Sequence, residues 1–178
     1  YHGARIRRYQ EIINNKLIAE ESALRQNLQA GNADFSSFPI INMLNTSHLI
    51  INPNSPQGVV KNNNALGSAW FVTELEYTNT TDDEFNQTLA LSTPSLKAVV
   101  NKNETPNNIG LSKGDIALTE YHPGYWKYES NNAGDGFAVF SEIHYPKGFE
   151  VTIDEQAVDM LRANYILRAL AVPAGNHV

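Results

Sequence analysis

The sequence predicts a mainly β protein of the α+β class, with antiparallel, sandwich-like sheets, a long N-terminal helix and a short helix near residues 82–90. Two observations carry this prediction. Between Asp115 and Ile153, apolar and aromatic runs alternate with breaks rich in Gly, Pro and Asn, which is the pattern of short strands joined by turns. The first 31 residues show apolar positions at helical spacing instead. The close spacing of the runs favours antiparallel neighbours over βαβ units.

Length and composition narrow the class of protein. A chain of 178 residues with 42% apolar residues is long enough for one domain, expected as a helix over 1–31 and a mostly β part over 38–178. A net charge of −6 argues against a nucleic-acid partner. No apolar run approaches the roughly 20 residues that span a membrane. Without a signal peptide or an initiator Met, the chain is interpreted as an excised fragment or a processed protein.

The cysteine content limits the chemistry further. The chain has no cysteine, which excludes disulfides and thiolate chemistry. This composition suits a reducing cytoplasm, and it equally suits a bacterial exterior without disulfides.

The N-terminal helix is expected over Ala4–Leu28. One face carries apolar residues at intervals of three and four, and Gly31 is a suitable stop because glycine readily ends helices. The apolar face consists of Ile6, Tyr9, Ile13, Leu17, Leu24 and Leu28. A short helical turn is expected after Pro39.

About seven to nine short strands are expected to follow. The short helix is predicted to begin near Thr81 or Asp82, either of which can cap it, with Phe85, Leu89 and Leu91 on its buried side. Loops are predicted at Asn54–Asn64 and Lys102–Lys113. The predicted strands are His48–Asn52, Ala69–Tyr77, Ala98–Val100, Ile116–Tyr121, Tyr125–Ser130, Phe137–Ile143, Phe149–Ile153, Ala157–Leu161 and Tyr165–Val172.

An aromatic cluster around one turn is the strongest binding signal. It consists of Tyr121, Tyr125, Trp126, Tyr128 and Tyr145. Flat aromatic faces stack on sugar rings, and tyrosine hydroxyls bond to sugar hydroxyls. Strand alternation places Tyr125 and Trp126 on opposite faces. The competing interpretation is a sandwich core with half-buried tyrosines at its rim, and we favour it for Trp126.

A second polar and aromatic group lies near the C-terminus. It consists of Arg162, Asn164, Tyr165 and Arg168. These residues are candidates to dock an anionic glycan or a membrane portion of the same protein. They suit a hydrogen-bonded strand corner equally well.

Signals for catalysis and for metals are weak. None of the five histidines pair at metal-ligand spacing, so no metal site or other cofactor is predicted. Glu120 and Glu142 lie on predicted strands and, if they face each other, offer the two carboxylates that glycoside hydrolysis needs. We favour solvated or Lys-paired acids, with Lys127 as a partner. The acids at 82–84 suit a helix start better than a calcium site.

Six segments occur in an order that covers nearly the whole chain. They are Tyr1-His2-Gly3-Ala4 with Arg7-Arg8-Tyr9, Asn42-Met43-Leu44-Asn45-Thr46, Ala65-Leu66-Gly67-Ser68-Ala69-Trp70-Phe71-Val72, Leu118-Thr119-Glu120-Tyr121, Tyr145-Pro146-Lys147-Gly148, and Arg162-Ala163-Asn164-Tyr165 with Leu167-Arg168-Ala169 and Val172-Pro173-Ala174-Gly175. As an ordered set they resemble the extracytoplasmic part of the YfhO family of bacterial polytopic membrane proteins. Where that family often has Gly-Trp and Asp-Gly, this chain has Gly148-Phe149 and Asp154-Glu155.

The resemblance implies a function and a location. YfhO-like proteins have many membrane helices in the manner of GT-C-like glycosyltransferases, and some are linked to glycosylation of cell-envelope polymers such as teichoic acids. Their catalytic acids are expected outside this segment, and the family chain continues into one more strand. The chain is therefore expected to be a soluble domain on the extracytoplasmic face of a bacterial inner membrane. It would not be catalytic alone, and it would contact its own membrane portion or an envelope glycan.

Two other functions stay open. The aromatic cluster motivates the second hypothesis, a free-standing, exported carbohydrate-binding β-sandwich. A structural module that only spaces membrane helices is the third hypothesis.

Overall fold

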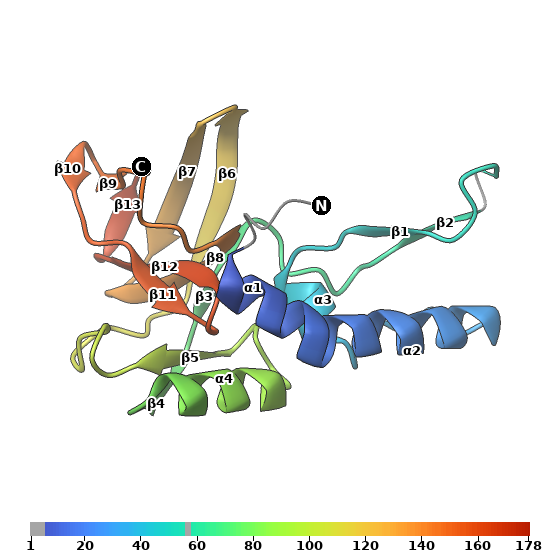
Figure 1. The fold of residues 1–178 in the computed structure, drawn as a ribbon. Helices are drawn as coiled ribbons and strands as arrows, with labels where there is room; N and C mark the ends of the chain where they lie inside the picture. Colours follow the sequence, from blue (N-terminus) through green and yellow to red (C-terminus); the bar gives the residue numbers. More distant parts are fainter. Residues whose placement is uncertain (1–5, 56–57) are drawn as a thin grey trace. The chain divides into compact units, whose positions relative to one another are not determined.

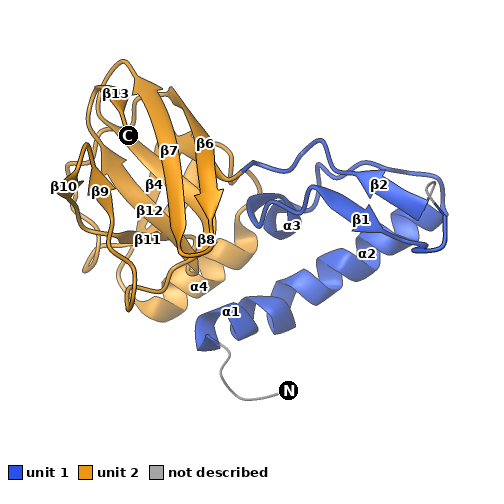
Figure 2. Ribbon diagram, turned by 90° about the horizontal axis from the view of Figure 1, so that it is seen from above, with its two compact units in different colours: residues 1–67 blue, residues 68–178 orange. Residues whose placement is uncertain are grey.

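The computed structural model describes residues 6–55 and 58–178, and it has the mainly β fold with antiparallel sheets that the sequence predicts (Figure 1). The chain forms two compact units, residues 1–67 and 68–178, shown in different colours in Figure 2. The predicted division placed the boundary between a helix over 1–31 and a β part over 38–178. In the structure, residues 38–67 belong with the helix.

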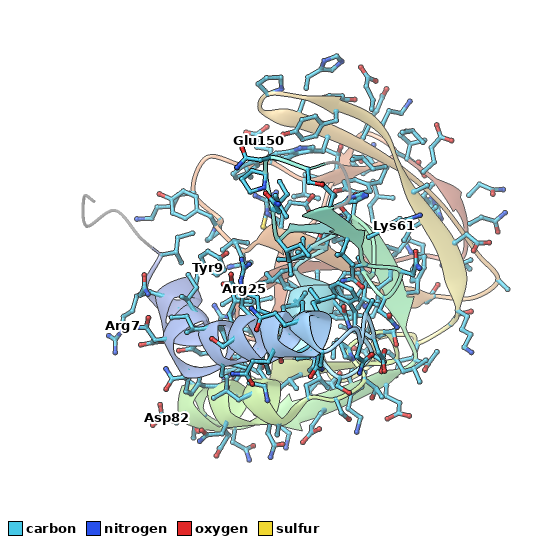
Figure 3. The ribbon with its side chains drawn as sticks, turned by 90° about the vertical axis from the view of Figure 1, so that its right-hand side faces the viewer. Arg7, Tyr9, Arg25, Lys61, Asp82 and Glu150 are labelled. Atoms are coloured by element: carbon cyan, nitrogen blue, oxygen red, sulfur yellow. The ribbon has the colours of Figure 1, made fainter. Side chains whose placement is uncertain are left out.

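The helical part of unit 1 is one continuous run with a local change of winding. It comprises α1 (Arg7–Ile12), a π-helical segment (Ile13–Leu17) and α2 (Ile18–Gln29). The predicted start at Ala4 lies outside the described residues. At the other end, Gly31 has φ +82° and donates its N–H to the carbonyl of Leu28, which confirms it as the stop. Arg7 points outward from the first turn (Figure 3).

The helical run packs within its own unit. A cluster of Leu24, Phe35, Phe38 and Ile41 forms the core, with Leu49 and Val60 packed against it. Leu24 comes from α2, Phe35 and Phe38 from the segment that follows it, and Ile41 from α3 (Pro39–Met43), which is the predicted turn after Pro39. Leu49 and Val60 come from a hairpin of β1 (His48–Ile50) and β2 (Val59–Lys61). The prediction of a plain loop over Asn54–Asn64 missed β2, whose Val60 buries part of its side chain against the helix.

Unit 2 is a sandwich of two antiparallel sheets. The four-stranded sheet has the order β11-β12-β8-β3, and the three-stranded sheet has the order β13-β7-β6. Residues of both sheets meet in one core, in which Phe71, Ala138, Phe140 and Val172 contact Ile116 and Tyr128. The strands are β3 (Ala69–Val72), β6 (Gly114–His122), β7 (Tyr125–Asn132), β8 (Gly136–Ile143), β11 (Leu161–Ala163), β12 (Leu167–Val172) and β13 (Gly175–His177).

The expected single strand Ala69–Tyr77 is two strands in different sheets. After β3, the N–H groups of Thr73 and Glu74 both donate to the carbonyl of Leu96, and the chain leaves β8 to form β4 (Glu74–Thr78). β4 pairs in parallel with β5 (Lys97–Asn101), with α4 between them in the chain. This part is a βαβ unit that the sequence analysis did not predict.

The short helix α4 (Thr81–Ala90) confirms the prediction near 82–90. Its cap is one residue earlier than expected, since the Thr80 hydroxyl accepts from the N–H of Asp83 at 3.1 Å. Asp82 points outward from the first turn (Figure 3). Glu84 and Thr88 are the fully buried residues, while Phe85 and Leu89 are half-buried.

The segment after β8 differs most from the prediction. Residues 144–151, which we call the strap, form no strand, and only Thr152–Ile153 of the expected strand remain as β9. β9 forms a tight hairpin with β10 (Gln156–Ala157). The expected strand Ala157–Leu161 is wrong: residues 158–160 separate β10 from β11, where Val158 donates one hydrogen bond to Val151. β13, which pairs with β7, was not predicted.

Candidate functional site

Unit 2 contains a groove of about 680 Å³. One side comes from β7, another from β8 and β12, and the strap and the β9–β10 hairpin supply the rest. The residues that carry its chemistry are Tyr125, Trp126 and Tyr128 from β7, Phe140 and Glu142 from β8, Arg168 from β12, and Phe149 and Glu150 from the strap. Glu150 is labelled in Figure 3. The first six of these side chains are held by regular strand backbone. Phe149 and Glu150 are not, because the strap has no regular secondary structure.

A stack of three side chains forms one wall of the groove. The rings of Trp126 and Phe149 lie 5.3 Å apart and are nearly parallel, with an interplanar angle of 22°. The guanidinium of Arg168 lies 4.0 Å from the Phe149 centroid and 5.2 Å from that of Trp126. These are cation–π distances. Phe149 thereby connects the irregular strap to the sheet.

The stacked Arg168 is held in place by further contacts. Its Nε–H donates to the carbonyl of Ile143 at 3.2 Å. Burial lowers the pKa of Arg168, and the nearby Glu142 carboxylate opposes that effect. The guanidinium is therefore a fixed, partly compensated charge rather than a mobile one.

Tyr128 and Glu142 form the polar pair of the groove. The Tyr128 hydroxyl donates to Oε1 of Glu142 at 2.8 Å. Burial raises the pKa of Tyr128, and the charge of Glu142 raises it further. The Tyr128 ring packs edge-on against Phe140, with centroids 4.9 Å apart. The phenol thus stays neutral and holds the carboxylate in one orientation.

An ion pair between the hairpin and the C-terminal strand lies in the lining of the groove. Nδ1 of His177 lies 2.6 Å from Oδ2 of Asp154, and the N–H of Val178 donates to the other carboxylate oxygen at 2.9 Å. Backbone also takes part, because the N–H of Asp154 donates to the carbonyl of Val178. The pKa of His177 is raised by this hydrogen bond, and that of Asp154 is lowered.

The structure brings together four of the nine residues that the sequence analysis selected. Tyr125, Trp126, Tyr128 and Arg168 all line the groove. Tyr121 contacts the Trp126 ring at 6.0 Å without lining the groove. Trp126 contacts Tyr121 and Tyr125 contacts His122, consistent with the predicted opposite faces.

Tyr145 lies on the strap with 47% of its surface exposed, outside the lining of the groove. It is therefore an exposed aromatic residue that the groove does not use.

The remaining three residues form a strand corner. Asn164 is fully buried, its backbone N–H donates to the carbonyl of Val99, and its side-chain oxygen accepts from the N–H of Val99 at 2.9 Å. Tyr165 is 5% exposed. Of the two interpretations of this group, the structural one fits Asn164 and Tyr165, since buried side chains offer no docking surface.

Arg162 belongs to the same corner and forms ion pairs there. Its Nε lies 3.3 Å from Oε1 of Glu84, which is 1% exposed, and its Nη2 also pairs with Glu104. Buried carboxylates need such partners. Nearby, burial lowers the pKa of His144, and the charge of Arg162 lowers it further.

The idea that Glu120 and Glu142 face each other is wrong. Glu120 lies opposite Lys127 in the β6–β7 ladder and contacts His122 at 2.9 Å. Glu142 lies on β8, in the other sheet, with Tyr128. The partner proposed for Glu120, Lys127, is its direct neighbour in the ladder.

Sequence reasoning missed two groove residues in their present role. Phe149 was expected to begin a strand and was noted as a departure from a family motif, and Glu142 was weighed as a hydrolytic acid and as a solvated or Lys-paired acid. A signal for Phe149 was available, because an aromatic residue directly after the break Pro146-Lys147-Gly148 has no strand partner and must cover an apolar surface elsewhere.

Neither metal ligands nor membrane helices are found in the described part of the chain. Residues 6–55 and 58–178 contain no group of three or more His, Asp or Glu side chains placed to hold a metal ion. Within the same ranges, no helix combines the length and apolarity needed to cross a bilayer.

Comparison of the chain with known protein families, with curated proteins and with solved structures finds no match.

Proposed function

We propose that this chain is a sugar-binding, extracytoplasmic domain of a YfhO-like membrane protein. In this role it holds an envelope glycan or polymer acceptor for a membrane-embedded, GT-C-like glycosyltransferase and has no catalytic activity by itself. The groove that Trp126, Phe149, Tyr128, Glu142 and Arg168 line is the observation that carries the proposal. The membrane context rests on the ordered motifs alone.

The chemistry of the groove supports a sugar. A pyranose ring has an apolar face, which stacks on Trp126 or Tyr125, and an equatorial rim of hydroxyls, which need fixed donors and acceptors. Glu142 accepts from hydroxyls and Arg168 donates to them.

Binding of oligosaccharides by titration calorimetry tests the sugar-binding part. Trp126→Ala removes an aromatic face, and since a ring contact with an aromatic side chain contributes about 0.5–1.5 kcal/mol beyond its buried area, affinity is expected to fall about tenfold. Tyr145→Ala is the matched control, because it removes an exposed aromatic residue of the strap that does not line the groove. Equal losses in both variants, with both folds intact by circular dichroism, contradict a role for the groove.

Fractionation of the source cells with an antibody against this chain tests the membrane part. The proposal expects a band far above 19.8 kDa that only detergent releases. A freely soluble band near that mass favours the second candidate, a free-standing carbohydrate-binding sandwich. The groove favours that candidate too, because all of its lining residues come from unit 2. If groove variants leave the activity of the whole protein unchanged, the chain acts as a structural spacer instead.

A further inference from the structure

The charges that line the groove are unbalanced. Four carboxylates line it, from Glu142, Glu150, Asp154 and Glu155, against the two permanent cations Lys127 and Arg168 and against His177, which pairs with Asp154. The surrounding unit has the same sign, since residues 68–178 contain seven Lys and Arg and fifteen Asp and Glu, a net charge of −8. A ligand that enters the groove therefore meets a negative potential.

The two cations already have partners. Arg168 is stacked on Phe149 and Trp126, donates to a backbone carbonyl and lies near Glu142. Lys127 lies opposite Glu120 in the β6–β7 ladder. Neither cation stands alone in the groove as a receptor for an anion.

Glu142 is the polar group best placed to select a ligand. Tyr128 donates to one of its oxygens and holds it on a regular strand. A carboxylate accepts several hydrogen bonds, so Glu142 has capacity for a sugar hydroxyl or an ammonium group. A ligand carboxylate or phosphate at the same place meets like charge, which disfavours its binding.

We propose that the groove takes an uncharged or amine-bearing sugar and rejects a sugar that carries a carboxylate or phosphate. The inference rests on the proposed function, because it names the ligand class of the same groove. If the acceptor is an anionic envelope polymer, its neutral or amino-sugar units enter the groove and its acidic units stay outside.

The experiment compares three ligands of one shape on the full 178-residue chain. Cellohexaose, the matching β-1,4 hexamer of glucosamine and the matching hexamer of glucuronate share one backbone; an ammonium replaces the C2 hydroxyl in the second, and a carboxylate replaces the C6 hydroxymethyl group in the third. A galactose-configured set covers the alternative stereochemistry. Titrations are run at low and at physiological ionic strength. We expect the neutral and amino hexamers to bind, and the acidic hexamer to bind about tenfold more weakly or not at all, with the gap narrowing as salt screens the charges.

The outcomes separate the inference from the function on which it rests. If the acidic hexamer binds as tightly as the neutral one, the inference is overturned and sugar binding stands. If no hexamer of either configuration binds, the proposed function fails and the inference fails with it.

A pair of variants locates the selectivity. Glu142→Gln keeps an acceptor for the Tyr128 hydroxyl but removes the charge, so the advantage of the amino hexamer over the acidic hexamer should shrink about tenfold. Glu129→Gln is the matched control, because Glu129 lies on β7, is exposed and does not line the groove. Equal effects of both variants would show that net charge alone sets the preference and would overturn the assignment to Glu142.

Discussion

Glu20 shows how one residue organises unit 1. Its carboxylate is 6% exposed, and Oε2 accepts from the N–H groups of Ile40 and Ile41 at 3.0 and 3.1 Å. These N–H groups belong to the first turn of α3, where no intrahelical partner exists. An acid 20 residues away in the sequence thus caps a short helix that has no side-chain cap of its own.

Removing this acceptor should destabilise the chain. Glu20→Ala leaves two N–H groups without their partner, and we expect a loss of about 2 kcal/mol in the free energy of unfolding. The loss of stability is no larger because the substitution also removes the cost of burying the carboxylate. The same burial raises the pKa of Glu20. Glu20→Gln keeps an acceptor oxygen and should cost about half as much. Urea unfolding measures both, and equal losses in the two variants contradict the capping role.

His177 and Asp154 form an ion pair whose strength depends on pH. The hydrogen bond raises the pKa of His177 above 6.5, so its contribution is fully present below pH 6.5 and is lost as pH rises through the raised value. The pKa of Asp154 is lowered below 3.8, so its contribution is present above pH 3.8 and is lost as pH falls through the lowered value. The contact that joins the hairpin to β13 is therefore strongest from pH 3.8 to 6.5.

NMR titration of the imidazole signals measures this directly. The pKa of His177 should exceed 6.5 in the wild type and return close to 6.5 in Asp154→Asn, because the amide cannot stabilise the imidazolium by charge. His144 is the internal control: burial lowers its pKa, and Asp154→Asn should leave that value unchanged. A His177 pKa that Asp154→Asn does not move rules out the pair as its cause.

At the scale of secondary-structure elements, the turn that joins β9 to β10 has an unusual residue composition. Asp154 and Glu155 form its two-residue loop, with φ of +49° and +67°. Such loops favour Asp or Asn first and Gly second, because both positions lie in the left-handed region. Asp154 suits its position, whereas Glu155 occupies one where a side chain is disfavoured.

Glu155→Gly should therefore stabilise the hairpin. A non-glycine residue in the left-handed region costs roughly 1–2 kcal/mol, and the greater freedom of glycine in the unfolded chain offsets part of the gain. We expect a net increase of about 0.5 kcal/mol in the free energy of unfolding, measured by thermal denaturation. Glu155→Ala is the control, because it removes the side chain's charge without relieving the backbone. A gain from Ala equal to that from Gly would assign the effect to charge.

Elements set by local pattern were predictable from the sequence, and elements set by distant partners were not. The helix at 7–29 and the hairpin β6–β7 follow from spacing and turn residues. The break at Thr73 depends on the carbonyl of Leu96, and the strap depends on Phe149 reaching Trp126 and Arg168. Neither partner is visible in a local window.

The candidate site divides along the same line. Its half on β7 was predicted because the aromatic residues are neighbours in sequence. Its half on β8 and the strap was not, because Glu142 and Phe149 join the site only through the fold. Asn164 illustrates the converse case: of its two interpretations the strand corner applies, since this polar residue is fully buried.

At the scale of the whole molecule, the two units differ in net charge, and each has a core cluster of its own. Residues 1–67 contain six Lys and Arg and four Asp and Glu, a net charge of +2, whereas residues 68–178 have −8. The core of unit 1 is built on Leu24, Phe35, Phe38 and Ile41, and that of unit 2 on residues of its two sheets. The whole groove belongs to unit 2.

This division predicts that residues 68–178 fold without unit 1. A core cluster of its own, sheets whose strands all come from this part of the chain and a length of 111 residues (68 to 178 inclusive) suffice for a small domain. The fragment should unfold in one cooperative thermal transition and bind sugar with an affinity within about threefold of the full chain. Starting at Ser68 keeps the carbonyl that accepts from the N–H of Ser141. A fragment that melts without cooperativity, while the full chain melts in one transition, would show that the units form a single folding unit and that the groove depends on both.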